Sequence, residues 1–386
     1  MANRRHVAWA VAVACLAGCA SDAPTHAPTP AAEPRPWPEA EATFHRDPRW
    51  LGGDAVSTLP VGHRRSMVFF GDTFVSTDPS LAARHRRGAS RMPRNTIALF
   101  DGQNPAAAGT SFAWGRDADG LPASYVPDRN DRFYWPGNGC LDGEDRAHVF
   151  YYRMKSTPGQ GLGFANDGYA VVTFTGIDGP LERWQVATVD APPIPFDAVP
   201  ATAVVVDGEW AIGLAIRQEG VHSGALMRTR IADLRAGRLG EREWWMGDAR
   251  GWVAEREVGP HGPLWVLEDA GAECSLHFDQ RLERWVHVTS DGFGATEIAV
   301  RTAPELTGPW SKPARVYRPP ESDGPRPLVY AAKAHPEWTV PGEDALVVTY
   351  ATNSLEFADL FTEPVETQRY WPHVVILPRD VIPTGE

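Results

Sequence analysis

Two aspartates, Asp54 and Asp72, occupy the open ends of a predicted β-hairpin, and their spacing is the first sign of chemistry in this chain. Residues 54–60 are predicted to form one strand, residues 62–65 the turn and residues 66–70 the returning strand. Because the aspartates are equally distant from a turn centred on His63, we expect them to face each other. Opposed residues on antiparallel strands have Cβ atoms about 5 Å apart. Two carboxylates this close repel unless they share a proton, a cation or a substrate, which indicates a functional site.

Paired carboxylic acids are what the hydrolysis of a glycosidic bond needs, one to protonate the leaving oxygen and one to activate water or attack carbon. Asp54 and Asp72 are the predicted catalytic pair, and Glu273 is a third catalytic candidate. Retaining enzymes separate the two groups by about 5–5.5 Å and inverting enzymes by about 6.5–9.5 Å, and the hairpin favours the short distance. The sequence leaves open whether this pair acts alone or is completed by Glu273. Structural alternatives are a turn or strand-end cap for each aspartate and an arginine-paired acid for Glu273.

Five further side chains are predicted to bind substrate, namely Trp135, Asn138, Lys333, His335 and Asn353. Lys333 and His335 are two residues apart on a predicted strand, so they share one face. His335 could act as an acid or a donor to substrate, although a structural histidine is the commoner case. Trp135 precedes Asn138 closely and offers an indole face for a sugar ring, whereas most other tryptophans are expected to pack between sheets.

The elements that must position these residues are predicted to be strands. Short apolar runs bounded by turn-forming residues dominate, and the 36 glycines and 35 prolines fit many turns. The runs recur as five hairpins with outer strands, within residues 54–100, 135–188, 202–231, 274–317 and 330–377. This recurrence predicts an all-β, five-bladed β-propeller, since a β-sandwich explains the strands but not their repetition. Its innermost strands would bring the candidate residues to one polar cup.

The N-terminus is predicted to be a targeting segment. Arg4 and Arg5 precede a short apolar run, and residues 16–19 (Leu-Ala-Gly-Cys) match a bacterial lipoprotein cleavage box. We expect residues 1–18 to be a signal peptide, Cys19 to be lipidated, residues 19–42 to form a Pro/Ala-rich tether and residues 43–386 to form the propeller. The alternative is an ordinary secretory signal. Either case predicts an exported protein of the cell envelope, and the lipoprotein case anchors it to a bacterial membrane.

Net charge limits the kinds of molecule that the protein could bind, and the cysteine content bears on whether it contains a disulfide. Removal of residues 1–18 leaves 35 basic and 49 acidic side chains, which argues against nucleic-acid binding. Cys140 and Cys274 are the cysteines that follow Cys19, and buried thiols are favoured over a disulfide. We expect a monomer with a glycan substrate, no catalytic metal and no cofactor, with a structural calcium ion in the central channel left open.

Several motifs resemble those of known carbohydrate-active families. Residues 301–303 with 306–310 resemble a blade-closing motif of five-bladed glycoside hydrolases of family 43. Residues 53–54 with 70–73, and residues 334–337 with Tyr350 and Asn353, look closer to bacterial secreted proteins of domain of unknown function 4185. Some of those proteins are endo-D-arabinanases of glycoside hydrolase family 183. The resemblance covers about residues 45–380.

The closer resemblance implies catalytic acids at Asp54 and Asp72, whereas family 43 implies a base at Asp54 and an acid across the pocket, for which Glu273 is the candidate. Family 43 also expects an aspartate at the start of the second blade, where this chain has Asn138, and this departure favours the Asp54–Asp72 assignment. We therefore predict a lipid-anchored glycoside hydrolase that acts on a furanoside-rich polysaccharide, with arabinan as one candidate. The alternatives are a non-catalytic carbohydrate-binding lipoprotein and a structural assembly lipoprotein.

Overall fold

The computed structural model describes residues 32–78, 87–143, 145–159 and 163–384 of the chain. The predicted signal peptide, Cys19 and the first part of the predicted tether lie outside the described residues. Within the described ranges, no helix is long and apolar enough to cross a membrane. The described residues fold mainly as antiparallel strands, so the predicted all-β class is confirmed.

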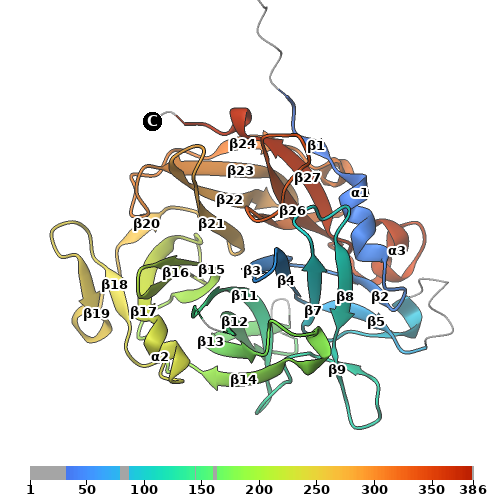
Figure 1. Ribbon diagram of the computed structural model, residues 1–386, viewed down its shortest axis with the longest axis horizontal. Helices are drawn as coiled ribbons and strands as arrows, with labels where there is room; N and C mark the ends of the chain where they lie inside the picture. The colour runs from blue at the N-terminus through green and yellow to red at the C-terminus, as the bar shows by residue number, and fades with distance from the viewer. Residues whose placement is uncertain (1–31, 79–86, 144, 160–162, 385–386) are drawn as a thin grey trace, which may run out of the picture. The chain divides into compact units, whose positions relative to one another are not determined.

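Five antiparallel sheets of four or more strands follow one another along the chain and surround a common centre (Figure 1). The first sheet contains β3 (Ser57–Val61), β4 (Arg65–Phe70), β7 (Thr96–Asp101) and β8 (Gly109–Ala113). The second contains β11 (Arg132–Leu141), β12 (Arg146–Ser156), β13 (Phe164–Thr175) and β14 (Gln185–Asp190). The third contains β15 (Val199–Asp207), β16 (Trp210–Ile216), β17 (Gly224–Arg230), β18 (Glu243–Trp245) and β19 (Trp252–Ala254), with β20 (Trp265–Leu267) beside β17. The fourth sheet contains β21 (Cys274–Asp279), β22 (Arg284–Phe293), β23 (Ala295–Ala303) and β24 (Ala314–Tyr317). The fifth contains β25 (Pro327–Ala334), β26 (Ala345–Ser354), β27 (His373–Pro378) and β1 (Arg35–Pro36).

Shorter strands and helices lie outside these five sheets. The additional strands are β2 (Trp50–Gly53), β5 (Thr73–Ser76) and β6 (Ser90–Arg91), which form one small sheet, and the pair β9 (Gly115–Arg116) and β10 (Pro122–Ala123). The α-helices are α1 (Pro38–Glu41), α2 (Ile231–Arg235) and α3 (Val365–Gln368), and the 3-10 helices are η1 (Ala42–His45), η3 (Arg87–Ala89), η4 (Leu181–Arg183), η5 (Glu255–Glu257), η6 (Pro320–Asp323), η7 (Phe357–Phe361) and η8 (Arg379–Val381).

The innermost strands β3, β11, β15, β21 and β25 form a ring in which a side-chain hydrogen bond joins each strand, or the residue directly after it, to the next. The five links are Asn138 Nδ2 to Thr58 O (2.9 Å), Val204 N to Asn138 Oδ1 (3.3 Å), Cys274 N to Thr202 Oγ1 (2.9 Å), Ala334 N to Ser275 Oγ (2.8 Å) and His335 Nδ1 with Thr58 Oγ1 (2.8 Å). The last link returns to the first strand. Sheets that radiate from a ring of inner strands define a β-propeller-like fold rather than the β-sandwich alternative.

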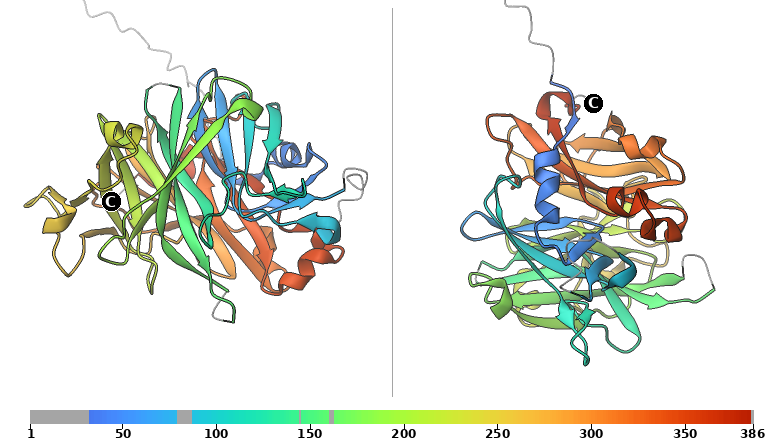
Figure 2. Two further views of the ribbon diagram at one scale, coloured as in Figure 1. Left: turned by 90° about the horizontal axis from the view of Figure 1, so that it is seen from below. Right: turned by 90° about the vertical axis from the view of Figure 1, so that its right-hand side faces the viewer.

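The N-terminal strand β1 completes the fifth sheet by pairing with the C-terminal strand β27. Arg35 and Pro36 of β1 pair with Ile376 and Val375 of β27, so residues far apart in sequence share one sheet (Figure 2). Trp37 N also donates to Val374 O at 2.7 Å. The predicted tether boundary at residue 42 is therefore placed too late, because residues 35–41 belong to the folded body. Composition alone could not reveal this, since the pairing partner lies more than 300 residues away.

Burial explains why the middle strands are apolar throughout. Strand β26 is buried at nearly every position because the neighbouring strands and sheets cover both of its faces. The first predicted hairpin is present, with Val61 opposite Arg65 across the turn. His63 and Arg64 in that turn have positive φ angles of 62° and 61°, which reverse the chain tightly. Cys140 and Cys274 are both buried free thiols, as predicted.

Candidate active site

Asp54 and Asp72 lie opposite each other where the first sheet meets the small sheet. The pairing Ser57 with Phe69 in β3–β4 and the pairing Gly53 with Thr73 in β2–β5 share one register, which places Asp54 across from Asp72. Their backbones are also joined, since Asp54 N donates to Asp72 O at 3.4 Å. The opposition predicted from the hairpin is therefore present in the structure.

The backbone around the pair leaves no room for larger residues. A Cβ atom at position 71 would lie 2.5 Å from Asp54 Oδ1, so Gly71 makes space for that carboxylate. Gly52 has φ +112°, and a Cβ atom there would lie 2.2 Å from Tyr370 O. Ala55, directly after Asp54, has a backbone φ of 55°, which residues other than glycine rarely adopt. Strained backbone of this kind persists where the surrounding structure holds it, often at functional sites.

Two tyrosine hydroxyls bind one oxygen of Asp54. Tyr330 donates to Asp54 Oδ2 at 2.5 Å, and Tyr370 donates to the same atom at 3.3 Å. The side chain is surrounded by protein on most sides but still partly open to solvent. Burial, followed by the charges of Asp72 and Glu273, raises the pKa of Asp54 well above its ordinary range, against the Tyr330 hydrogen bond and Lys333. Asp54 is thus disposed to hold a proton near neutral pH.

Asp72 has a donor for each oxygen. Trp135 Nε1 donates to Oδ1 at 2.9 Å, and Arg94 NH1 donates to Oδ2 at 3.2 Å. Burial raises the pKa of Asp72, but less far than that of Asp54, because the charge of Arg94 and both hydrogen bonds act in the opposite direction. The guanidinium of Arg94 is held over the ring of Phe133, 4.6 Å from its centroid. The pair is therefore asymmetric, with Asp72 the more readily ionised member.

Glu273 approaches Asp54 from the fourth sheet. It lies directly before β21, and its Oε1 accepts a hydrogen bond from Lys333 Nζ at 3.0 Å. Lys333 is buried, so this ion pair lies largely out of water. Glu273 raises the pKa of Asp54 and Lys333 lowers it, which means that both charges lie near that carboxyl group. The three predicted acids are thus accompanied by two cations, Lys333 beside Glu273 and Arg94 beside Asp72.

The remaining predicted residues divide into two groups. Trp135 contacts Asp72, and Asn353 lies beside the Tyr330 hydroxyl, where its hydrogen bond opposes the increase in the Tyr330 pKa that burial and Asp54 cause. Asn138 and His335 lie deeper, and both serve as links of the inner-strand ring. The second imidazole nitrogen of His335 is also hydrogen-bonded, to Thr349 Oγ1 at 2.7 Å, and burial lowers the His335 pKa to about 3. Their substrate-binding roles stay predictions, with side chains already engaged in structural bonds.

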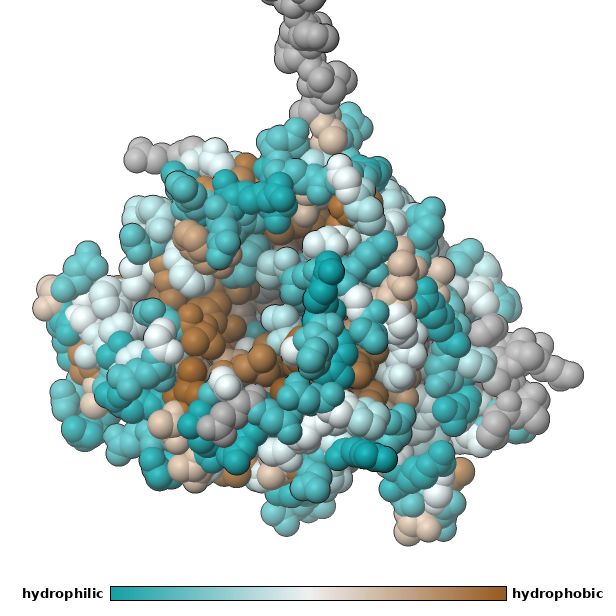
Figure 3. Space-filling view, in the orientation of Figure 1, coloured by the Kyte–Doolittle hydropathy of each residue, from teal (hydrophilic) through white to brown (hydrophobic). Residues whose placement is uncertain are grey.

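The opposite end of the channel is a cavity of about 540 Å³, whose wall includes three of the predicted site residues, Asn138, Lys333 and His335. Its wall also includes Leu59, Val206, Leu276 and Phe278, together with His277. Figure 3 shows hydrophobic side chains gathered around a hollow at the centre of this face. Asp54 and Asp72 are not part of its wall. Among the residues that the structure describes, no group of three or more His, Cys, Asp or Glu side chains is arranged to hold a metal ion.

Sequence reasoning missed Tyr330, Tyr370 and Arg94. Tyr330 is three residues before Lys333, so regular alternation would place it on the other face; it shares the site because the β25–β26 register shifts between Tyr330 and Lys333. Tyr370 follows a short helix and reaches the site through a positive φ of 66°, for which the sequence gives no signal. Arg94 comes from the connection before β7, and arginines are too frequent in this chain to stand out.

A cluster of carboxylates at one end of a ring of antiparallel sheets defines a β-propeller-like protein with a carboxylate site. Residues 39–377 match the family described as domain of unknown function 5005, and the chain belongs to that family. The family resemblance predicted from the motifs, to domain of unknown function 4185, is not confirmed by this match. No curated protein matches the chain.

Solved structures resemble the fold. A provisionally named hydrolase from Bacteroides ovatus aligns with a TM-score of 0.68 at 16% identity, over 89% of each chain. The catalytic domain of a family 62 α-L-arabinofuranosidase from Coprinopsis cinerea aligns with a TM-score of 0.46 at 12% identity, over 86% of this chain and 92% of that one. An endo-arabinase from Bacteroides thetaiotaomicron has a TM-score of 0.40 at 10% identity, over 85% and 94%. At these identities the likeness to the first of these structures shows a shared fold.

Proposed function

We propose that this protein is a glycoside hydrolase acting on a furanoside-rich polysaccharide, built on five propeller blades that correspond to the five sheets. The observation that carries the proposal is the asymmetric pair of opposed carboxylates, Asp54 and Asp72, with different hydrogen-bond donors on each. Two carboxyl groups with environments that separate their pKa values are the pattern of a proton donor and an ionised partner. The hydrolase name of the Bacteroides ovatus neighbour agrees with this assignment.

The contacts assign a role to each acid. Asp54, whose pKa is raised furthest, protonates the leaving oxygen through Oδ1, because Oδ2 is taken by the tyrosines. Asp72 stays ionised beside Arg94 and Trp135, and stabilises the positive charge that develops on the sugar ring or activates water. Glu273, paired with Lys333, supplies negative charge that helps to keep the proton on Asp54.

Reducing-sugar release from a panel of plant and bacterial glycans, arabinans included, tests the proposal. Wild type should release sugar from at least one glycan, and Asp54→Asn and Asp72→Asn should each lower kcat by about 100- to 10,000-fold. Asp101→Asn is the matched control, because Asp101 is an exposed acid at the far end of the same sheet. Unchanged release in both site variants would exclude the catalytic assignment. Binding without release on any glycan would favour the carbohydrate-binding alternative.

We also propose, from the sequence, that Cys19 is lipidated and anchors the protein to a bacterial membrane. The cleavage box at residues 16–19 and the Pro/Ala-rich segment after it support this. Metabolic labelling with a fatty-acid analogue should mark wild type and leave Cys19→Ser unmarked, and equal labelling of the two would contradict the anchor.

A further inference from the structure

The acid pair lies in the middle of a series of contacts that ends in an aromatic residue on each side. On one side, Asp72 accepts a hydrogen bond from Trp135, whose ring packs edge-on against Phe164 with centroids 4.6 Å apart. On the other side, Asp54 binds Tyr330, the residue after Val329, whose N–H donates to Gly294 O at 2.8 Å. Gly294 is next to Phe293 at the end of β22. The two aromatic ends therefore come from the second and fourth sheets, with both acids between them.

Phe293 is the most exposed large hydrophobic side chain among the described residues, at 82% exposure. It lies in the turn of the β22–β23 hairpin between Gly292 (φ 115°) and Gly294 (φ 75°). An aromatic side chain with so little burial contributes little to folding stability. The turn is nevertheless fixed in position, because Gly294 is hydrogen-bonded to the start of β25, one residue from Tyr330. An exposed phenyl ring on a turn that is bonded to the residue before Tyr330 is suited to contact a ligand that reaches the acids.

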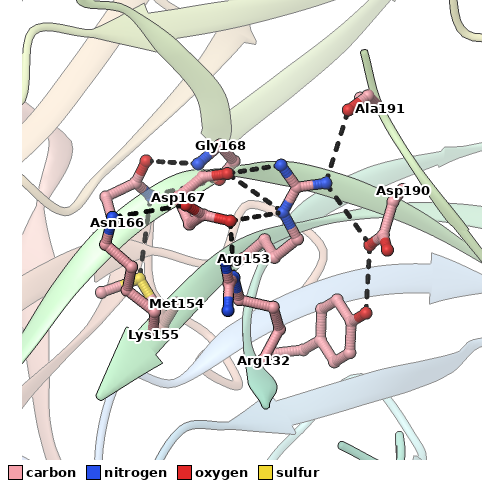
Figure 4. Close-up of polar contacts among 10 residues, drawn as sticks. Arg132, Arg153, Met154, Lys155, Asn166, Asp167, Gly168, Asp190 and Ala191 are labelled. Atoms are coloured by element: carbon pink, nitrogen blue, oxygen red, sulfur yellow. Dashed lines mark hydrogen bonds and ion pairs between the residues drawn. The ribbon is translucent and has the colours of Figure 1, made fainter. Parts of the chain in front are cut away.

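A charged network lies on the same strands of the second sheet as the other two aromatic residues, Trp135 and Phe164 (Figure 4). Arg132 Nε binds Asp167 Oδ2 at 2.6 Å, and Arg153 Nε binds the carbonyl oxygen of Asp167 at 3.0 Å. These residues tie together β11, β12 and β13 at the end where Trp135 and Phe164 lie. The network cross-links the strands that carry the rings, and the Trp135 ring is itself held by Asp72 and Phe164. Groups that are ordered before a ligand arrives lower the entropic cost of binding.

We propose that the substrate is an extended polysaccharide chain that lies across this face, with sugar units on both sides of the cleaved bond. Units on one side contact Trp135 and Phe164, and units on the other side stack on Phe293. This inference rests on the proposed hydrolase function and deepens it, because a site flanked on both sides cleaves within a chain. Contacts with remote units supply binding energy that orients the reacting bond, so a short substrate loses rate as well as affinity.

The test compares Phe293→Ala with Phe278→Ala on two substrates, the polysaccharide cleaved best in the glycan panel and an aryl glycoside of its main sugar. Phe278 is the matched control, a 45% exposed phenylalanine in the same sheet but at the opposite end of the channel. Phe293→Ala should lower kcat/KM on the polysaccharide about three- to tenfold and leave the aryl glycoside unchanged, as expected for one lost ring contact. Phe278→Ala should change neither. Wild type should release oligosaccharides early in the reaction.

Three results would overturn the inference: equal activity of Phe293→Ala and wild type on the polysaccharide, equal loss on both substrates, or release of monosaccharide alone by wild type. A second readout separates this inference from the proposed function, namely retardation of the protein in native gels that contain the polysaccharide. If wild type is retarded but hydrolyses nothing, the hydrolase proposal fails while weaker retardation of Phe293→Ala still supports the binding surface. Equal retardation of both proteins would exclude that surface.

Discussion

The two ends of the central channel bury ionisable groups in opposite ways. At one end, Asp54 and Asp72 accept hydrogen bonds from tyrosine hydroxyls, an indole and a guanidinium. At the other end, the two ring nitrogens of His277 have no hydrogen-bond partner among the described residues, and burial lowers the His277 pKa to about 4. His335, between the ends, is held by two hydroxyls and is also kept neutral.

This difference shows that burial by itself selects the neutral form and produces no chemistry. Burial raises the pKa of Asp54 and lowers that of His277. An acid and a cation, Asp279 and Arg379, also lie near His277, but of the two groups only Asp54 has a directly opposed carboxylate and hydrogen-bond donors on its side chain. A shifted pKa combined with a specific set of charged partners is the better sign of a functional site. The comparison predicts that changes at the acid end alter rate, whereas changes at the histidine end alter only stability.

Among the residues that support the acid pair, the largest effect is expected from Arg94→Met, which removes the cation from Asp72. Because Arg94 lowers the pKa of Asp72, its loss should raise that pKa and leave less of the required carboxylate at neutral pH. We expect kcat to fall about 100-fold at pH 7, in keeping with the loss of a hydrogen bond to a charged group. Part of the activity should return at higher pH, so the acidic limb of the pH–rate profile moves upward. Exposed Arg91, on the neighbouring strand β6, provides the control as Arg91→Met; an unmoved acidic limb in Arg94→Met would contradict the role given to Asp72.

The next effect separates the two tyrosines on Asp54. Tyr330→Phe removes the donor at 2.5 Å and should lower kcat about tenfold by releasing the carboxyl group from its orientation. Since this hydrogen bond lowers the Asp54 pKa, its loss should also move the basic limb of the pH–rate profile to higher pH. Tyr370→Phe removes only the contact at 3.3 Å and should have the smaller effect. An equal loss of kcat in Tyr330→Phe and Tyr370→Phe would contradict the expectation that the shorter hydrogen bond to Asp54 contributes more to catalysis.

Some of the residues behind these predictions could be placed in the site from the sequence, and others could not. The opposition of Asp54 and Asp72 followed from counting residues about one turn, because register in a hairpin is fixed by local geometry. The convergence of Glu273 and Lys333 followed from the repetition of hairpins, which aligns equivalent positions of successive sheets. Both signals are local or periodic, and the structure contains both features.

The missed features depend on contacts between distant segments. Tyr370 reaches Asp54 across 316 positions of sequence, has a φ of 66°, and its carbonyl oxygen lies close against Gly52. The pairing of β1 with β27 likewise joins the two ends of the folded body. For Asn138 and His335, polarity suggested substrate contacts, while the ring of inner strands uses the same groups as structural links. A sequence does not distinguish a polar group that faces substrate from one that satisfies a neighbouring backbone.

A third prediction concerns the stability cost of the acid pair. The folded pKa of Asp54 is raised above its unfolded value near 3.8, so the folded state binds more protons and its stability falls as pH rises from about 4 through the folded pKa. Asp54→Asn removes this penalty and should stabilise the protein by about 2 kcal/mol at pH 8, with little gain at pH 4. Urea unfolding at the two pH values measures it, with Asp101→Asn as the control. A gain that is the same at both pH values would mean that charge is not its cause.

The smallest effect is expected at the opposite end, from His277→Phe. Activity should stay within about twofold of wild type, because His277 lines the cavity that excludes Asp54 and Asp72. Its folded pKa of about 4 lies below the unfolded value of 6.5, so the unfolded state binds more protons between these values and stability is lost as pH falls through this window. His277→Phe should therefore gain about 1 kcal/mol at pH 5.5 relative to pH 8, measured by urea unfolding, whereas exposed His261→Phe should show no such difference. A loss of activity in His277→Phe beyond that of Tyr330→Phe would break the comparison, since it would show that the two ends of the channel are coupled, for which Lys333 is the shared residue.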